Sequence, residues 1–151
     1  MSIVLSKRLH HHHHHGHHDL LLLPILSLTA EERTRSRYHF ITDDKTPVYL
    51  QLPRGTALQD GDLLTSETGD ILVKVAAKAE PVLTVTSDDS INLIRAAYHL
   101  GNRHVSLEIT PTYLRLTPDS VLERMLTQLG LQVVAEVAPF RPQGGAYSHQ
   151  H

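Results

Sequence analysis

The sequence predicts an α+β protein, in which an all-β N-terminal domain is followed by a ferredoxin-like βαββαβ domain. Two observations support this fold class. In residues 1–76, short apolar stretches alternate with closely spaced turn residues, as is typical of short antiparallel strands. In residues 77–147, strand-like stretches alternate with two segments of helical periodicity. Residues 148–151 form a tail that contains histidine and that we expect to be flexible.

Alternating apolar residues predict the strands of the N-terminal domain. The first is Leu20 to Leu28, which is broken by Pro24 and Ser27 and is too short to span a membrane. Thr29 to Glu32 has the spacing of a capping box or a tight turn. Further strands are expected at residues 38–40, 48–52, 63–65 and 71–76. Turn residues between them, such as Asp60-Gly61-Asp62, indicate a small sandwich or barrel.

The C-terminal domain opens with a predicted strand at Val82 to Thr86. A helix is then expected to begin near Asp88-Asp89-Ser90 and to stop at Gly101, because acidic residues cap helix starts and glycine ends helices. Its apolar stripe is predicted to contain Ile91, Ile94 and Tyr98.

Two further strands and a second helix complete the predicted βαββαβ order. Val105 to Ile109 and Tyr113 to Leu116 are expected to be strands separated by a Thr-Pro-Thr turn. Thr117-Pro118 supplies a predicted N-cap with proline at the first helical position. The helix is expected to end at Gly130, before a final strand from Gln132 to Ala138. Its apolar face is predicted to consist of Val121, Leu122, Met125, Leu126 and Leu129.

Composition narrows the classes of function. The 151 residues carry a net charge of −2 and no cysteine, so disulfides, thiolate catalysis and cysteine-ligated zinc are excluded. We expect no nucleic-acid binding, because no basic charge excess is present and strands 82–86 and 104–109 carry no aromatic residue for base stacking. Since no stretch is long enough to cross a membrane and no signal-peptide cleavage site is evident, we expect a cytoplasmic protein without membrane contact.

Histidine is the only specialised metal ligand, and it is concentrated near the N-terminus. Eight imidazoles fall within nine residues. They are His10, His11, His12, His13, His14, His15, His17 and His18. If native, this run is a metal reservoir; the alternative is an expression tag. A natural-looking sequence, Met1 to Leu9, precedes the run, whereas tags usually follow the initiator methionine directly.

A second histidine pair brackets the predicted junction between the first helix and the next strand. The segment reads Tyr98-His99-Leu100-Gly101-Asn102-Arg103-His104. An exposed junction can present a metal ligand, but a single His at a helix end can also pair with the helix dipole or pack on the surface. One imidazole alone cannot hold a metal ion.

The YHLGNRH heptad resembles the urease accessory nickel metallochaperone family. Other matching segments are LERMLTQLGL at 122–131, Ala138-Pro139-Phe140, Gly144-Gly145-Ala146-Tyr147, ERTRSR at 32–37, LPRGT at 52–56 and GDLL at 61–64. The similarity covers nearly the whole chain from about Leu26. It implies a β-rich N-terminal domain similar to a peptide-binding domain of Hsp40-type chaperones, joined to a ferredoxin-like metal-binding domain.

The resemblance also implies a metal site and partners. In the family, the position of His104 lies at a homodimer interface between C-terminal domains, where two copies bind one Ni²⁺. His149 and His151 are expected to help complete the site; His99 matches a family position but can equally pack. Some relatives carry two further His near the start of the second helix, and this chain has none there. The implied partners are the GTP-hydrolysing urease accessory protein and, through it, the urease apoprotein complex.

The expected function is storage and delivery of Ni²⁺ during assembly of the urease metallocentre rather than catalysis. His sites also bind Cu²⁺ or Zn²⁺, so the assignment of nickel depends on the family. An enzyme is not expected, because Asp88-Asp89 and Glu31-Glu32 are better explained as cap and turn residues and no nucleophile motif or phosphate loop is present. The alternative is a peptide-binding or scaffold protein in which metal binding is incidental.

Overall fold

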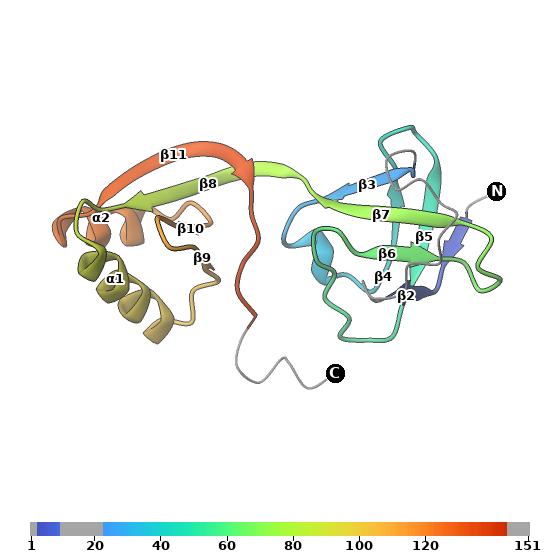
Figure 1. Cartoon of the computed structure of the whole chain (residues 1–151), viewed down its shortest axis with the longest axis horizontal. Coiled ribbons are helices and arrows are strands. Elements are labelled where there is room, and N and C mark those ends of the chain that lie inside the picture. The colour runs from blue at the N-terminus through green and yellow to red at the C-terminus, as the bar shows by residue number, and fades with distance from the viewer. Residues whose placement is uncertain (1–2, 10–22, 145–151) are drawn as a thin grey trace. The chain divides into compact units, whose positions relative to one another are not determined.

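A computed structural model describes residues 3–9 and 23–144 (Figure 1). The chain divides into two compact units, Met1–Lys78 and Ala79–His151. Unit 1 contains β1 (Ile3–Leu5), β2 (Lys7–Leu9), β3 (Ile25–Leu28), the 3₁₀ helix η2 (Glu32–Thr34), β4 (Arg37–Ile41), β5 (Pro47–Gln51), β6 (Leu63–Thr65) and β7 (Leu72–Ala77). Unit 2 contains β8 (Ala79–Thr86), α1 (Ser90–Asn102), β9 (Glu108–Ile109), β10 (Leu114–Leu116), α2 (Ser120–Gln128) and β11 (Gln132–Pro139). Within the described part of the chain, neither helix is long and apolar enough to cross a membrane.

The N-terminal unit contains two small sheets with one shared core. Their strand orders are β1-β5-β4 and β2-β6-β7-β3. The expectation of antiparallel strands alone was wrong, since β1 pairs with β5 and β3 with β7 in parallel. These partners lie far apart in sequence, and the long connections allow parallel pairing.

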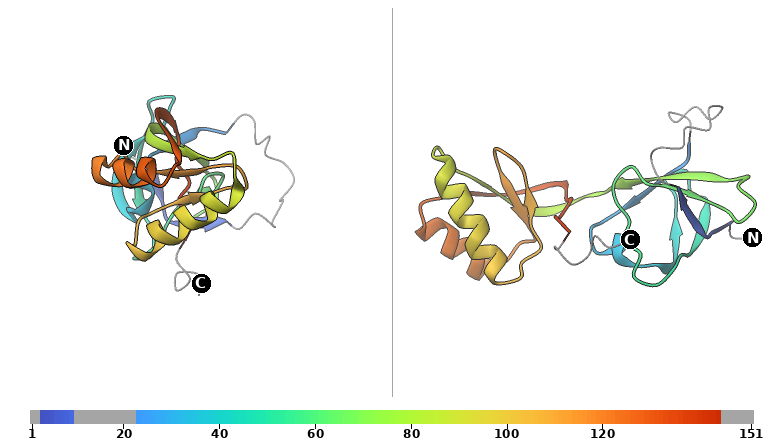
Figure 2. Two further views of the ribbon diagram at one scale, coloured as in Figure 1. Left: turned by 90° about the vertical axis from the view of Figure 1, so that its left-hand side faces the viewer. Right: turned by 60° about the horizontal axis from the view of Figure 1, so that its bottom comes forward.

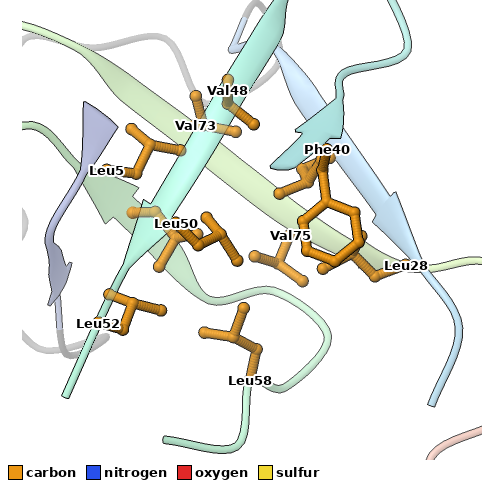
Figure 3. Packing of buried hydrophobic residues seen from close by; sticks show 11 residues of the cluster. Leu5, Leu28, Phe40, Val48, Leu50, Leu52, Leu58, Val73 and Val75 are labelled. Carbon is orange, nitrogen blue, oxygen red and sulfur yellow. The ribbon is translucent and has the colours of Figure 1, made fainter. Parts of the chain in front are cut away.

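Alternation along the strands explains the core of this unit. Val48 and Leu50 on β5 are fully buried, whereas Pro47 and Gln51 are exposed. Leucine, valine and phenylalanine side chains from both sheets converge in Figure 3, together with Leu58 from a loop. Thr29 and Glu32 exchange the two hydrogen bonds of a capping box, of 2.9 and 3.2 Å, which confirms that prediction.

The C-terminal unit has the ferredoxin-like topology. Its four strands lie in the order β11-β8-β10-β9, and every pairing between neighbours is antiparallel. Both helices lie on one face of the sheet (Figure 2). Residues of α1 and α2 share one buried cluster with residues of the sheet. The α+β fold class predicted from the sequence is therefore confirmed.

The buried face of α1 differs from the predicted one. Asp89 caps the helix by accepting a hydrogen bond from the amide of Ile91, as expected, but α1 continues past Gly101 to Asn102. The core face consists of Leu93, Ala96 and Leu100. The predicted stripe of Ile91, Ile94 and Tyr98 is 41, 63 and 66% exposed. Both sets have helical spacing, so periodicity alone did not identify the buried one.

Helix α2 begins later than predicted. Its N-cap is Asp119 rather than Thr117, and one carboxylate oxygen accepts the amides of Val121 and Leu122 at 2.9 and 3.0 Å. Leu126 is the fully buried residue of the predicted apolar face, whereas Val121 is 74% exposed. The helix ends at Gln128, just before Gly130, close to the expected position.

Candidate metal site

Helix α1 ends in a Schellman motif in which His104 reverses the chain. The amide of His104 donates to the carbonyl of Gly101 at 3.0 Å, and the amide of Val105 donates to the carbonyl of Leu100 at 3.1 Å. His104 has a φ of 57°, in the left-handed region. Val105 and Leu100 pack in the same core, which supplies the apolar contact that often accompanies this motif.

Helix α2 ends in the same motif with glycine in the reversing position. Gly130 has a φ of 88°, and its amide donates to the carbonyl of Thr127 at 3.0 Å. Among the described residues other than glycine, only His104 and Lys45 have a positive φ. The left-handed conformation costs an L-residue about 1–2 kcal/mol. Strain of this kind is concentrated at functional sites, so His104 is a functional candidate on backbone grounds.

The side chain of His104 is not needed to hold the fold. The hydrogen bonds that end the helix come from the main chain, and His104 is exposed together with residues 101–103. An exposed imidazole on a rigid helix end can bind a metal ion with little rearrangement of the protein.

His99 has a different environment. It is half-buried, and its ring lies 5.6 Å from that of Tyr98 in an edge-on arrangement. Its carbonyl accepts a hydrogen bond of 3.0 Å from Nη1 of Arg103. The partial burial and the ring contact with Tyr98 support a packing role for this imidazole.

An apolar stripe on α1 leads toward the end of the helix that carries His104. Ile91, Ile94 and Tyr98 follow one another at helical spacing and are each at least 41% exposed. Large apolar side chains that gather on an exposed face typically mark a site of protein interaction. The stripe is therefore a candidate interface on the helix that ends at the candidate ligand.

In the sequence, the N-terminal histidine run follows β2 and precedes β3, two strands that belong to one sheet. β2 ends at Leu9, β3 begins at Ile25, and these are the two outer strands of the order β2-β6-β7-β3. The run at 10–18 falls outside the described residues, but its flanks on both sides belong to the fold. A tag is usually added to the end of a chain, so this position favours a native segment.

The remaining histidines give no assembled site in the described residues. His39 on β4 is exposed, and its ring lies 4.5 Å from that of Tyr49, consistent with a structural role. His149 and His151 lie outside the described residues. In residues 3–9 and 23–144, no three His, Asp or Glu side chains are grouped so as to hold a metal ion.

A buried carboxylate close to His104 in sequence was missed by the sequence analysis. Glu108 is 5% exposed, and it accepts hydrogen bonds from the amide of Arg141 at 2.7 Å and from the hydroxyl of Tyr113 at 3.2 Å. The only signal in the sequence is an acidic residue inside an otherwise strand-like stretch. Its partner at Arg141 is too distant in sequence to be found from pattern.

Comparison with known proteins agrees with this architecture. The family model "UreE urease accessory protein, N-terminal domain" matches residues 5–77, and the model of the C-terminal domain matches residues 80–151. The chain is 60% identical over 126 residues to a urease accessory protein UreE from Nostoc sp. (strain PCC 7120), covering 83% of this chain and 86% of that protein.

More distant relatives carry the same name. The protein from Thermosynechococcus vestitus is 56% identical, with 83% of this chain and 87% of the relative covered. The protein from Burkholderia lata is 48% identical, with 85% of this chain and 61% of the relative covered. The shared name describes an accessory protein rather than an enzyme, as predicted. With both family models matching in order and together covering nearly all of its residues, the chain belongs to the UreE family of urease accessory proteins.

Proposed function

We propose that this protein is a metallochaperone that binds Ni²⁺ and donates it during assembly of the urease metallocentre. Membership of the urease accessory family supplies the role in urease maturation. The observation that supports metal binding is the exposed imidazole of His104, held in a left-handed backbone conformation at the end of α1. The backbone conformation at position 104 favours glycine, so a histidine there is best explained if its imidazole has a function.

A homodimer supplies the second ligand. One imidazole is too few for Ni²⁺, but a twofold axis near His104 doubles every ligand. The exposed stripe of Ile91, Ile94 and Tyr98 supports such an interface, because burial of apolar side chains stabilises association. We therefore assign the two His104 side chains of a dimer to one Ni²⁺ ion, with contact between C-terminal units.

Further histidines extend this primary pair. We assign His149 and His151 as tail ligands that complete the coordination shell. The run His10 to His18 is assigned as a reservoir, supported by its position between two strands of the N-terminal unit. His99 is left out of the primary set, since its ring packs against Tyr98.

The ligand chemistry suits a donor that must release its ion. Nitrogen and oxygen ligands without thiolate bind Ni²⁺ with moderate strength and also accept Cu²⁺ or Zn²⁺. Because a metal requires neutral imidazole, binding weakens as pH falls below the ordinary His pKa of about 6.5. Delivery would proceed in the cytoplasm to the GTP-hydrolysing urease accessory protein and, through it, to the urease apoprotein complex.

Urease activation at limiting nickel tests this proposal. Cells or extracts that contain the apoprotein and the other accessory proteins would be supplied with the parent chain or with His104→Gly. We expect the variant to fold and to lower urease activity severalfold at limiting Ni²⁺ but not at excess Ni²⁺. Equal activation by both proteins at limiting nickel would contradict the proposal.

The competing function is that of a peptide-binding scaffold built on the β-rich N-terminal unit. In that case His104→Gly would activate urease normally, and activation would depend on residues 1–78 at every nickel concentration. The same experiment, repeated with a chain that lacks residues 1–78, therefore separates the two functions.

A further inference from the structure

Gly101 is the one glycine within α1 and α2, and nothing in the described residues requires it. Its φ is negative, unlike that of Gly130, so the backbone conformation does not select glycine. A Cβ added at Gly101 would meet no atom of another segment within 4 Å in the part of the chain that the structure describes. Because glycine is less favourable than alanine in a helix, Gly101 lowers the stability of α1 without a local reason.

The end of α2 shows the usual arrangement of the same motif. The amide of Gly130 donates to the carbonyl of Thr127 at 3.0 Å. In α1 the amide of His104 donates to the carbonyl of Gly101 at 3.0 Å, so position 101 corresponds to 127 and position 104 to 130. The glycine and the residue with a side chain have therefore exchanged places in α1. Both choices there oppose the preference of the backbone, and conflicts of this kind are expected at functional sites.

A second molecule that approaches Gly101 closely explains the missing side chain, because glycine is used where another backbone comes near. Gly101 is exposed, and it continues the exposed stripe at helical spacing after Ile94 and Tyr98. We assign this molecule as a second copy of the chain, since the shared metal ion proposed above brings two His104 residues together. A residue beside a twofold axis lies opposite its own copy, so two glycines would meet there.

Building on the nickel role proposed above, we propose that Gly101 is a positioning residue whose missing side chain lets α1 of two copies approach until both His104 imidazoles bind one Ni²⁺. Gly101 itself does not touch the metal. The axes of two packed helices lie about 8–10 Å apart, and the side chains at the contact decide the distance. Distances between a metal and its ligands vary by only about 0.2 Å. A larger side chain at position 101 therefore moves the two imidazoles farther apart than the coordination allows.

Gly101→Ala and Gly101→Leu change the size of this side chain at similar helix propensity. Ni²⁺ affinity would be measured by calorimetry on the full chain, and dissociation of the metal-free dimer by sedimentation. We expect nickel binding at the shared site to weaken by about five- to a hundredfold, as for bulk added to a close-packed contact, and most in Gly101→Leu. The metal-free dimer should weaken in the same order. Thr127→Ala is the matched control, because it raises helix propensity at the corresponding position of α2 and should change neither quantity.

A measurement of stability separates positioning from a role in the fold. In a chain that carries Ile94→Glu to keep it monomeric, Gly101→Ala should raise the melting temperature by about 2–8 °C. The reason is that alanine favours the helix and its Cβ meets no other segment of the described residues. A lower melting temperature would show that the fold itself needs glycine, and it would overturn the proposal.

The binding measurements can contradict the role of Gly101 in three ways. Unchanged nickel affinity in Gly101→Leu would overturn it, and so would an equal loss of affinity in Thr127→Ala. Weaker nickel binding with an unchanged metal-free dimer would also overturn it, because the effect would then arise within one helix end. Failure of the proposed function is distinct, since His104→Gly would then keep the tight site. Loss of that site in His104→Gly, with full binding in Gly101→Leu, overturns the role of Gly101 alone.

Discussion

Replacing His104 by glycine should separate stability from metal binding. The change removes the left-handed strain of an L-residue, worth about 1–2 kcal/mol. Glycine also increases the conformational entropy of the unfolded chain, which reduces this gain in stability by about 0.4–1 kcal/mol. Because the imidazole is exposed and the helix-ending bonds come from the main chain, little packing is lost. The expected net effect is a stabilisation of about 0.5–1 kcal/mol, together with loss of the tight nickel site proposed at His104.

Gly130 provides the reverse experiment on the second helix. It has a φ of 88° in the same motif, and a Cβ added there meets nothing within 4 Å. Gly130→Ala should therefore destabilise the unit by about 1 kcal/mol through backbone strain alone. His104→Gly removes the strain of a left-handed backbone and Gly130→Ala introduces it. The two substitutions should therefore change the free energy of unfolding in opposite directions.

Thermal unfolding followed by circular dichroism at helical wavelengths measures both variants. In the described chain both α-helices belong to the C-terminal unit, so the helical signal reports on that unit. For a domain of this size, 1 kcal/mol shifts the melting temperature by about 4–8 °C. The metal-free protein must be used, since bound nickel would stabilise the parent. A His104→Gly chain that melts below the parent, with Gly130→Ala unchanged, would refute the strain argument.

Three further predictions concern the helices and the sheet of the C-terminal unit. Asp119→Ala should destabilise α2 by about 1 kcal/mol in urea unfolding, because it removes the N-cap, whereas an equal loss in Thr117→Ala would contradict the observed cap. The pKa of Glu136 is lowered by the hydroxyl of Thr84 and then by Arg115, so its contribution to stability is present at neutral pH and is lost as pH falls through the lowered pKa. In Glu136→Gln, the free energy of unfolding should therefore fall less steeply as pH drops below about 4.3. The same dependence on pH in the variant and the parent would refute this. Ile94→Glu should dissociate the proposed dimer into monomers in light scattering, whereas Val121→Glu on α2, where the apolar side chain is 74% exposed against 63% for Ile94, should not.

Much of the fold was predictable because local chemistry determines it. The predicted strand at residues 63–65 coincides with β6, and the capping box, the cap at Asp89 and the helix end at Gly130 each follow from contacts within a few residues. β1 and β2 were not predicted, since three-residue strands carry too little alternation to be distinguished. The buried face of α1 was predicted wrongly because two apolar stripes run along it, and contact with the sheet selects one of them.

The candidate site was less predictable from pattern. His104 was identified through a family motif, whereas spacing alone favoured a role as a helix-cap or packed surface residue. Its left-handed backbone could not be read from the sequence, since glycine rather than histidine is usual at that position. The contact between Glu108 and Arg141 spans 33 residues and depends on the packing of the whole unit.

The stoichiometry of bound nickel tests the central claim most directly. Calorimetric titration of the metal-free full chain with Ni²⁺, combined with mass analysis in solution, would be carried out on the parent and on His104→Gly. We predict a dimer with one tightest Ni²⁺ per two chains, and loss of that site in a His104→Gly dimer that remains folded. Retention of the same tight site in His104→Gly, or one tight Ni²⁺ on each isolated chain, would contradict a shared site at His104.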